Sequence, residues 1–445
     1  MPHPPGASGT VNRMRIALFS LFPSIQAKRI GRLAINLTLG GRVRVWLTSA
    51  LLLSTSLASA QGITVAIGGG LKDDNLAVWS RLVSLAGGAG SRFTVFATAS
   101  GDPERTASRI AANLTRHGAV VEVAEVAPRL PGIDLTAAVA DPRWIEAVRR
   151  STGVFFSGGA QSRLLDTLQP GGQPTPLLQA VQAMWDAGGV VAGTSAGAAV
   201  MSRRVFRNAP DVLAVMKGRL REGREIDDGF GLLPPDVIVD QHAVRRGRIA
   251  RLLPMLQAEG VPLGIGVAED TAIVARAPMV EVIGSRGALF VDIAQASTDA
   301  TLGDFNLRGA RLHWLEAGDR FDLATRRVLP AERRQIANRL TPKLNRPPTA
   351  RPQTTATDRP RAGPIFRDIL DDGAIVQAMA QRLEGRGADV LGLAFSDPQT
   401  RDDPDPSLGF EWWLRASAST HGFRAPDGLT LVDLVLDVVP VRSSR

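Results

Sequence analysis

Short apolar runs alternate with amphipathic segments between residues 63 and 195, and this alternation constrains the fold more than any other feature. Runs rich in Val, Ile and Phe predict buried strands at residues 63–70, 92–100, 119–126, 152–159 and 189–195. The segments between them have helical periodicity, at residues 75–87, 103–118, 141–151, 161–168 and 177–187. Such alternation predicts right-handed βαβ units and an α/β fold in which helices cover a mainly parallel sheet.

Glycines gather where three of these predicted strands end, at Gly68–Gly70, Gly158–Gly159 and Gly193–Gly197. Ligands of open α/β sheets bind beyond the carboxyl ends of the strands. The three glycine-bearing ends are therefore expected to converge on one crevice, which is the predicted site.

One of these ends carries a serine in a recognisable setting. Gly193-Thr194-Ser195-Ala196-Gly197 fits the G-x-S-x-G nucleophile elbow, in which a sharp turn from strand to helix lifts the serine hydroxyl clear of the sheet. The pattern is short and made of common residues, so it also fits an inert strand-to-helix turn with a capping Ser or Thr.

A serine nucleophile needs a base, and His242 is the best placed of the five histidines. It follows the apolar strand of residues 236–240, so it lies at another strand end. The other four histidines are less well placed. His3 lies near the N-terminus, His117 at the end of a predicted helix, His313 in a predicted hairpin and His421 near the C-terminus.

The acid that orients this base has three candidates: Asp240, Glu269 and Asp270. Asp240 is two residues from His242, so both side chains would point the same way on an extended strand. Glu269 and Asp270 end the apolar strand of residues 262–270. Spacing by itself leaves the choice among them open.

The rest of the chain divides into segments of different character. Residues 262–276, 279–293 and 310–323 are expected to form antiparallel hairpins that complete a domain of residues 61–330. Residues 331–364 predict a linker, with five prolines between 343 and 364. Residues 365–445, with a helical pattern at Ala374–Leu383, predict an accessory tail that either folds as a small domain or packs back on the core.

The net charge of +9 arises mainly in the first 60 residues, which hold seven basic residues and no acidic one. The remainder holds 45 basic and 43 acidic residues, which argues against binding a nucleic-acid backbone.

An apolar run at 45–53 and Ala58-Ser59-Ala60 predict a signal peptide of residues 1–60, and so a periplasmic or secreted protein with no membrane span after processing. A retained signal anchor is the alternative. The chain has no Cys, which excludes disulfides and a thiolate nucleophile.

Four segments together carry a resemblance: VFFSGGAQSRL, GTSAGAAVM, VDQHAVRRGRIARL and LGIGVAEDTAI. Their order and spacing resemble the cyanophycinase and aspartyl-dipeptidase (peptidase E-like) family of serine peptidases, and cyanophycinase in particular, over residues 62–329. The resemblance implies a fold like that of class I glutamine amidotransferases, with serine replacing the cysteine nucleophile, and no metal or cofactor. It also implies a triad in which Ser195 is the nucleophile, His242 the base and Glu269 the orienting acid.

The resemblance further implies a substrate, cyanophycin, whose polyaspartate backbone carries arginines, and β-aspartyl-arginine dipeptides as products. The backbone N–H groups of Gly159 and Ala196 would form the oxyanion hole. The residues expected to contact substrate are Gln161, Asp240, Arg246, Arg248 and Arg251, with Asp240 receiving a substrate guanidinium and the arginines binding carboxylates.

Two positions depart from the family pattern. Ala160 stands where the family has Asp, and Ala268-Glu269-Asp270 stands where it has Asp-Glu-Asn. These changes leave two alternatives to cyanophycin hydrolysis. One is a peptidase for other aspartyl or isoaspartyl peptides, and the other is a non-catalytic secreted binding protein on the same scaffold. Whether the chain forms a homodimer stays open.

Overall fold

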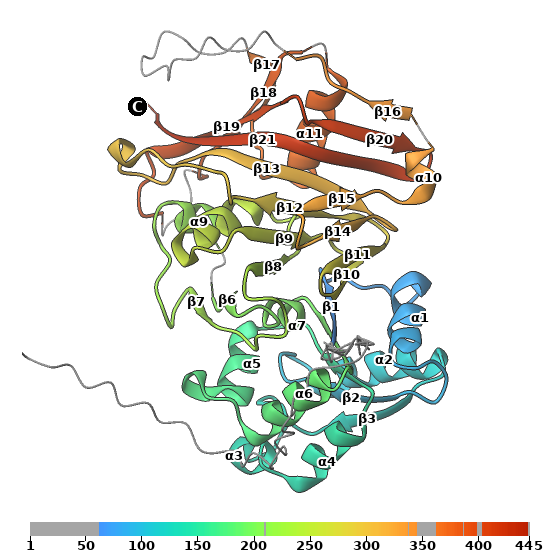
Figure 1. The fold of residues 1–445 in the computed structure, drawn as a ribbon. Helices are drawn as coiled ribbons and strands as arrows, with labels where there is room; N and C mark the ends of the chain where they lie inside the picture. The colour runs from blue at the N-terminus through green and yellow to red at the C-terminus, as the bar shows by residue number, and fades with distance from the viewer. Residues whose placement is uncertain are drawn as a thin grey trace, which may run out of the picture. The chain divides into compact units, whose positions relative to one another are not determined.

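Two large β-sheets organise the chain (Figure 1). The computed structural model describes residues 62–208, 211–336, 338–344, 362–385, 387–397 and 403–443. The predicted signal peptide, and residues 345–361 of the predicted linker, lie outside the described residues.

The first sheet contains the predicted parallel strands. These are β1 (Ile63–Ile67), β2 (Arg92–Phe96), β3 (Val120–Ala124), β4 (Gly153–Phe156) and β5 (Val190–Thr194). They run parallel in the order β1-β5-β4-β2-β3, so the ends of β1, β5 and β4 lie side by side. The predicted convergence of three glycine-bearing strand ends is confirmed.

Helices cover both faces of this sheet (Figure 1). They are α1 (Leu76–Leu85), α2 (Pro103–Arg116), α3 (Leu135–Ala138), α4 (Pro142–Arg150), α5 (Gln161–Leu168) and α6 (Pro176–Asp186). Helices α1 and α2 share a core with Val65 and Phe155, whereas α4, α5 and α6 share a core with Ala66 and Phe156. Neighbouring strand residues thus serve opposite faces, as strand geometry requires.

The later strands alternate between the two sheets. Strands β10 (Thr271–Arg276), β11 (Met279–Gly284), β14 (Arg320–Asp322) and β15 (Arg327–Leu329) extend the first sheet in antiparallel fashion from β1. Strands β8 (Val237–Gln241), β9 (Leu263–Val267), β12 (Gly287–Asp292) and β13 (Leu307–Glu316) belong to the second sheet.

This alternation corrects the predicted hairpins. Residues 262–276, 279–293 and 310–323 each hold one strand of each sheet, so none of them folds back on itself. The antiparallel neighbours joined in sequence are instead β10 with β11, β12 with β13, and β14 with β15. The links at 268–270, 285–286 and 317–319 have turn-like composition, but they carry the chain from one sheet to the other.

The C-terminal region continues the second sheet, which is one of the two arrangements left open by the sequence. Its elements are β17 (Ala362–Phe366), β18 (Asp389–Ala394), β19 (Leu408–Arg415), β20 (His421–Ala425), β21 (Gly428–Arg442) and α11 (Ala374–Glu384). Helix α10 (Glu332–Gln335), strand β16 (Asn338–Leu340) and the start of β17 lie within residues 331–364, where a linker was predicted. Strand β21 pairs with β13, giving the order β17-β18-β19-β21-β13-β12-β9-β8. A buried ion pair of 2.6 Å between Lys217 and Asp403 adds a second attachment.

The remaining α-helices and strands lie between β5 and β9. They are α7 (Ala196–Ala199), β6 (Arg204–Phe206), α8 (Val212–Met216), β7 (Ile226–Asp228) and α9 (Ile249–Glu259). Throughout the described ranges, no helix combines the length and the apolar character that crossing a bilayer would require. The mixed α/β class is confirmed, while the glutamine amidotransferase-like class stays a prediction.

Candidate active site

Ser195 occupies a strained turn between β5 and α7. Its φ of 52° and ψ of −113° are unusual for a residue with a side chain, and its N–H donates to the Ile67 carbonyl at 2.9 Å. A Cβ at Gly193 would overlap the Gly197 carbonyl, and one at Gly197 would overlap the Phe156 carbonyl. Both flanking glycines are therefore required for the elbow.

His242 follows the end of β8 and reaches the serine. Its Nε2 lies 3.0 Å from Ser195 Oγ, and its backbone N–H donates a hydrogen bond of 2.8 Å to the Gly68 carbonyl. A Cβ at Gly69 would overlap the imidazole, so the loop after β1 approaches the ring closely because it lacks a side chain there. Burial lowers the pKa of His242, and the charges of Arg246 and Arg248 lower it further against the opposing effect of Glu269. The ring is therefore neutral at pH 7 and able to accept a proton.

Glu269 lies in the link between β9 and β10 and contacts the other side of the ring. Its Oε1 is 2.6 Å from His242 Nδ1, and its Oε2 accepts a hydrogen bond of 2.7 Å from Arg245 Nη1. Burial would raise the pKa of Glu269, but the hydrogen bonds from Arg245 and His242 lower it overall, so the carboxylate is ionised. A hydroxyl, a neutral imidazole and a carboxylate in hydrogen-bonded series have the arrangement that activates a serine nucleophile.

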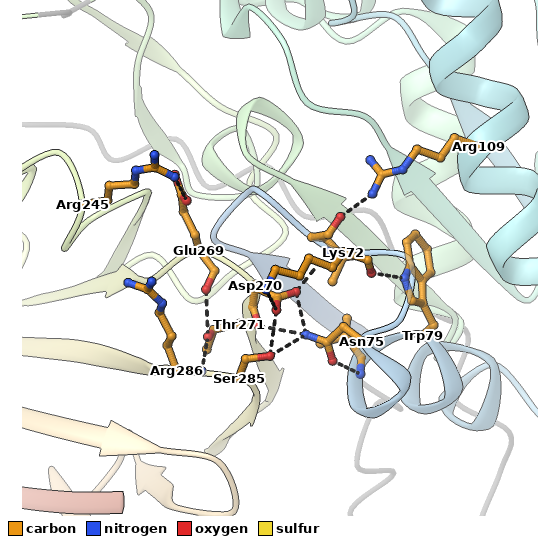
Figure 2. A network of polar contacts seen from close by, with 12 residues as sticks. Lys72, Asn75, Trp79, Arg109, Arg245, Glu269, Asp270, Thr271, Ser285 and Arg286 are labelled. Atoms are coloured by element: carbon orange, nitrogen blue, oxygen red, sulfur yellow. Dashed lines mark hydrogen bonds and ion pairs between the residues drawn. The ribbon is translucent and has the colours of Figure 1, made fainter. Parts of the chain in front are cut away.

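Asp270, another candidate for the acid, serves a different network (Figure 2). Its Oδ1 accepts hydrogen bonds from Lys72 N–H at 3.0 Å and from Asn75 Nδ2 at 2.8 Å, and its Oδ2 accepts one from Ser285 Oγ at 2.7 Å. Figure 2 shows Asp270 turned toward these partners and the Glu269 side chain turned away from them. Asp270 therefore fixes the loop between β1 and α1 against the link that carries Glu269.

The surroundings of Asp240 contradict two predictions made from the sequence. It is 1% exposed, and its carboxylate pairs with the buried Arg251, with Arg251 Nε donating at 2.6 Å and Nη2 at 2.7 Å. The guanidinium expected from substrate is thus supplied by the chain itself, so neither residue is available to contact substrate. Asp240 and His242 also do not share a strand face, because β8 ends at Gln241 and His242 has a φ of 50°.

Replacing Asp240 with Asn is expected to lower the free energy of unfolding by about 3–5 kcal/mol, because Arg251 would keep a buried charge without a carboxylate. Chemical denaturation measures this loss. Asp73→Asn is the matched control, since the Asp73–Arg109 pair is half exposed (53% and 51%) and its loss is expected to cost less than about 1 kcal/mol. Equal losses in the two variants would contradict a structural role for the Asp240–Arg251 pair.

The other two predicted arginines lie beside the base. Arg248 donates to the Gln241 carbonyl at 3.0 Å, and burial together with the charge of Arg251 lowers its pKa to about 10. Arg246 is exposed, and its side chain forms no ion pair with any residue that the structure describes. Of the predicted arginines, Arg246 is thus the one most accessible to a ligand.

The predicted oxyanion donors belong to the backbone after β4 and to the residue that follows Ser195. A Cβ at Gly158 would lie 3.2 Å from Ser195 Cβ, which places the backbone after β4 beside the elbow. The N–H groups of Gly159 and Ala196 donate to no other described residue, and Ala196 begins α7, where first-turn amides lack helical partners. Gln161 is the first residue of α5 and follows Gly159 by two positions in the chain. Its side chain is partly buried.

Two further residues of the site were not predicted. Gln241 Oε1 lies 3.3 Å from Ser195 Oγ, and Arg245 binds the outer oxygen of Glu269. Gln241 stands between Asp240 and His242 in the Asp-Gln-His element, which was a usable signal. Arg245 is one of several arginines after the base, and only the fold distinguishes it from its neighbours.

Comparisons with known proteins point to one family. Residues 64–283 match the sequence model of peptidase family S51. A cyanophycinase from Geminocystis herdmanii is 32% identical over 258 residues, which cover 56% of this chain and 88% of that protein. The chain belongs to peptidase family S51. The resemblance predicted from the four sequence segments is thereby confirmed.

Other relatives of this S51 chain match it over shorter lengths. A cyanophycinase from Synechococcus elongatus is 34% identical over 189 residues, 40% of this chain and 55% of that protein. The chain thus spans about half the length of this relative (55%). Among solved structures, a peptidase from an acI-B1 Actinobacterium superposes with a TM-score of 0.43 at 22% identity, covering 59% of this chain and 97% of that one.

Proposed function

We propose that this S51 chain is a serine exopeptidase that hydrolyses cyanophycin to β-aspartyl-arginine dipeptides through Ser195, His242 and Glu269. One observation carries the proposal. Ser195 Oγ, on a strained elbow, lies 3.0 Å from His242 Nε2, and His242 Nδ1 lies 2.6 Å from Glu269. An inert strand-to-helix turn does not require this series of contacts.

The proposed reaction proceeds through an acyl-enzyme. Ser195 Oγ attacks the substrate carbonyl while His242 Nε2 accepts the hydroxyl proton, and Glu269 stabilises the resulting imidazolium. The N–H groups of Gly159 and Ala196 stabilise the oxyanion. His242 then donates the proton to the departing amine. Water attacks the ester in the second half of the reaction, and its proton passes through His242 back to Ser195.

The substrate class rests on the relatives and on the charge around the base. The relatives from Geminocystis herdmanii and Synechococcus elongatus are cyanophycinases. The exposed guanidinium of Arg246 beside His242 is suited to a carboxylate of an aspartate-rich chain, because arginine binds carboxylates in bidentate fashion.

A second candidate is hydrolysis of other aspartyl or isoaspartyl peptides, and one observation favours it. The Asp240 carboxylate, expected to bind a substrate arginine, is occupied by Arg251. Ala160 also lacks the carboxylate that the family pattern has at this place. Fewer carboxylates are therefore available for substrate arginines than the cyanophycinase resemblance implies.

Product analysis separates these functions. Purified protein is incubated with cyanophycin and, separately, with short Asp-X and isoAsp-X peptides, and the products are identified by mass spectrometry. Release of β-aspartyl-arginine is expected. Hydrolysis of the short peptides with intact cyanophycin would favour the second candidate. No hydrolysis and no labelling by a serine-directed fluorophosphonate would favour the non-catalytic binding protein.

Export is a further part of the proposal, supported by the basic, apolar and Ala-x-Ala order of the first 60 residues. The mature protein is expected to begin at or near Gln61. N-terminal sequencing of protein from the periplasm or culture medium measures this. Protein that carries the intact leader would contradict cleavage, and intact leader on cytosolic protein alone would contradict export.

A further inference from the structure

The turn of residues 367–373 joins β17 to α11 and lies outside residues 64–283, the part that matches the family model. It is anchored on the second sheet. Ile369 is fully buried, and its N–H donates to the Leu393 carbonyl at 2.9 Å. A Cβ at Gly392 of β18 would lie 2.6 Å from Ile369 Cβ, so side chain and strand are closely packed. The turn therefore has a fixed position relative to β18.

The same turn packs on the segment that carries the base. Gly247, five residues after His242, has a φ of 54°, and a Cβ there would lie 2.6 Å from both the Cβ and the carbonyl oxygen of Leu370. Val244 and Ile249, on either side of Gly247, share a core cluster with Ile369. The path of the chain from His242 to α9 is thus shaped by contact with the C-terminal region.

The turn also reaches the link that carries the acid. Asp372 lies 3.9 Å from Arg286, and Arg286 N–H donates to Thr271 Oγ1, which in turn donates to the Glu269 carbonyl at 3.2 Å. Figure 2 shows Arg245 and Arg286 on the same side of Glu269. The Asp372–Arg286 pair is about half exposed, so it contributes little energy by itself. The packing at Gly247 and Ile369 is the stronger contact.

We infer that the turn of residues 367–373 is a positioning element that sets the base-bearing segment against the acid-bearing link. The inference rests on the proposed function, because it assigns a role in holding His242 and Glu269. It gives the C-terminal region a part in catalysis without contact to substrate. Displacing the turn is expected to slow acyl transfer, because small misplacements of catalytic groups have large effects on rate.

The test displaces the turn from its far side, without changing any residue of the active site. Gly392→Ala adds a methyl group against Ile369. Gly409→Ala, in the neighbouring strand β19, is the matched control because its methyl would meet the Phe395 ring instead. Three measurements are made on both variants and on the wild-type protein. They are the rate at which a fluorophosphonate labels Ser195, kcat and KM for the substrate that the wild-type protein hydrolyses, and thermal unfolding.

Gly392→Ala is expected to slow labelling and lower kcat by about tenfold or more with KM nearly unchanged. Gly409→Ala is expected to stay within about twofold of wild type in both rates. Folded Gly392→Ala protein that labels at the wild-type rate would overturn the inference. Wild-type protein that is neither labelled nor active would instead overturn the proposed function, and the inference with it.

A second pair of variants decides the question if Gly392→Ala does not fold. Gly247→Ala and Gly260→Ala place a side chain at similar left-handed positions, with φ of 54° and 63°. Only at Gly247 would the methyl collide, and its three nearest atoms all belong to Leu370. Slower labelling in Gly247→Ala alone supports the inference, and equal rates in the two variants refute it.

Discussion

Ser195→Ala is expected to lower kcat by roughly 10⁴- to 10⁶-fold and to leave the protein folded. The hydroxyl is the atom that forms the acyl-enzyme, so its removal leaves only the oxyanion donors and substrate binding. The small side chain keeps the elbow, because the strained backbone is held by Gly193, Gly197 and the hydrogen bond to Ile67. Steady-state kinetics on the active substrate measure the loss, and labelling by a fluorophosphonate is expected to disappear.

The control for this variant is Ser80→Ala, which removes an exposed hydroxyl on α1. It is expected to keep wild-type kinetics and labelling. Retention of more than about a tenth of the wild-type kcat by Ser195→Ala would show that another group is the nucleophile. A change in the far-UV circular dichroism of Ser195→Ala would show instead that the hydroxyl supports the fold.

Glu269→Gln is expected to lower kcat by roughly 10³- to 10⁴-fold. An amide cannot stabilise the imidazolium, and it can hold His242 in the wrong tautomer. The groups around His242 determine how its pKa changes. Burial, Arg246 and Arg248 lower the pKa of His242, and Glu269 raises it. Without the carboxylate the pKa of His242 falls further, so the acid limb of the kcat/KM profile is expected to move to lower pH.

Glu281→Gln is the matched control, because Glu281 is a partly exposed carboxylate that pairs with Arg81. It is expected to leave both kcat and the acid limb in place. The effect of Glu269→Gln should be similar for cyanophycin and for a small activated ester, because the triad serves every acyl transfer. If Glu269→Gln kept nearly normal rates while stably folded Asp240→Asn lost its activity, the orienting acid would be Asp240 and not Glu269.

The contrast between Asp240 and Glu269 shows where sequence spacing reached its limit. Both carboxylates lie at the ends of apolar strands near the base, and alternation along a strand made Asp240 a candidate without deciding between the two. The left-handed backbone at His242 interrupts that alternation and turns the imidazole toward Glu269, 27 positions away along the chain. Long-range contacts of this kind depend on the packing of β8 beside β9, which no local pattern specifies.

The predicted hairpins show a related limit. Strands β9 and β10 are adjacent in sequence and separated by a turn-like link, yet one pairs with β8 and β12 and the other with β1 and β11. Apolar alternation indicates that a strand has a buried face, but it does not specify the partner strand. The link between them gains its function from this division, because Glu269 stands where the chain passes from the second sheet to the first.

By itself, the sequence determined the parallel sheet, the covering helices and the serine elbow. These follow from local periodicity and from glycines that a tight backbone requires, as at Gly193 and Gly197. The tertiary structure alone decided that Asp240 pairs with Arg251, that Arg245 binds Glu269, and that the turn at Leu370 packs on Gly247. The physical reason is that charge pairing and close packing depend on which distant segments meet, and this is fixed only when both sheets are assembled.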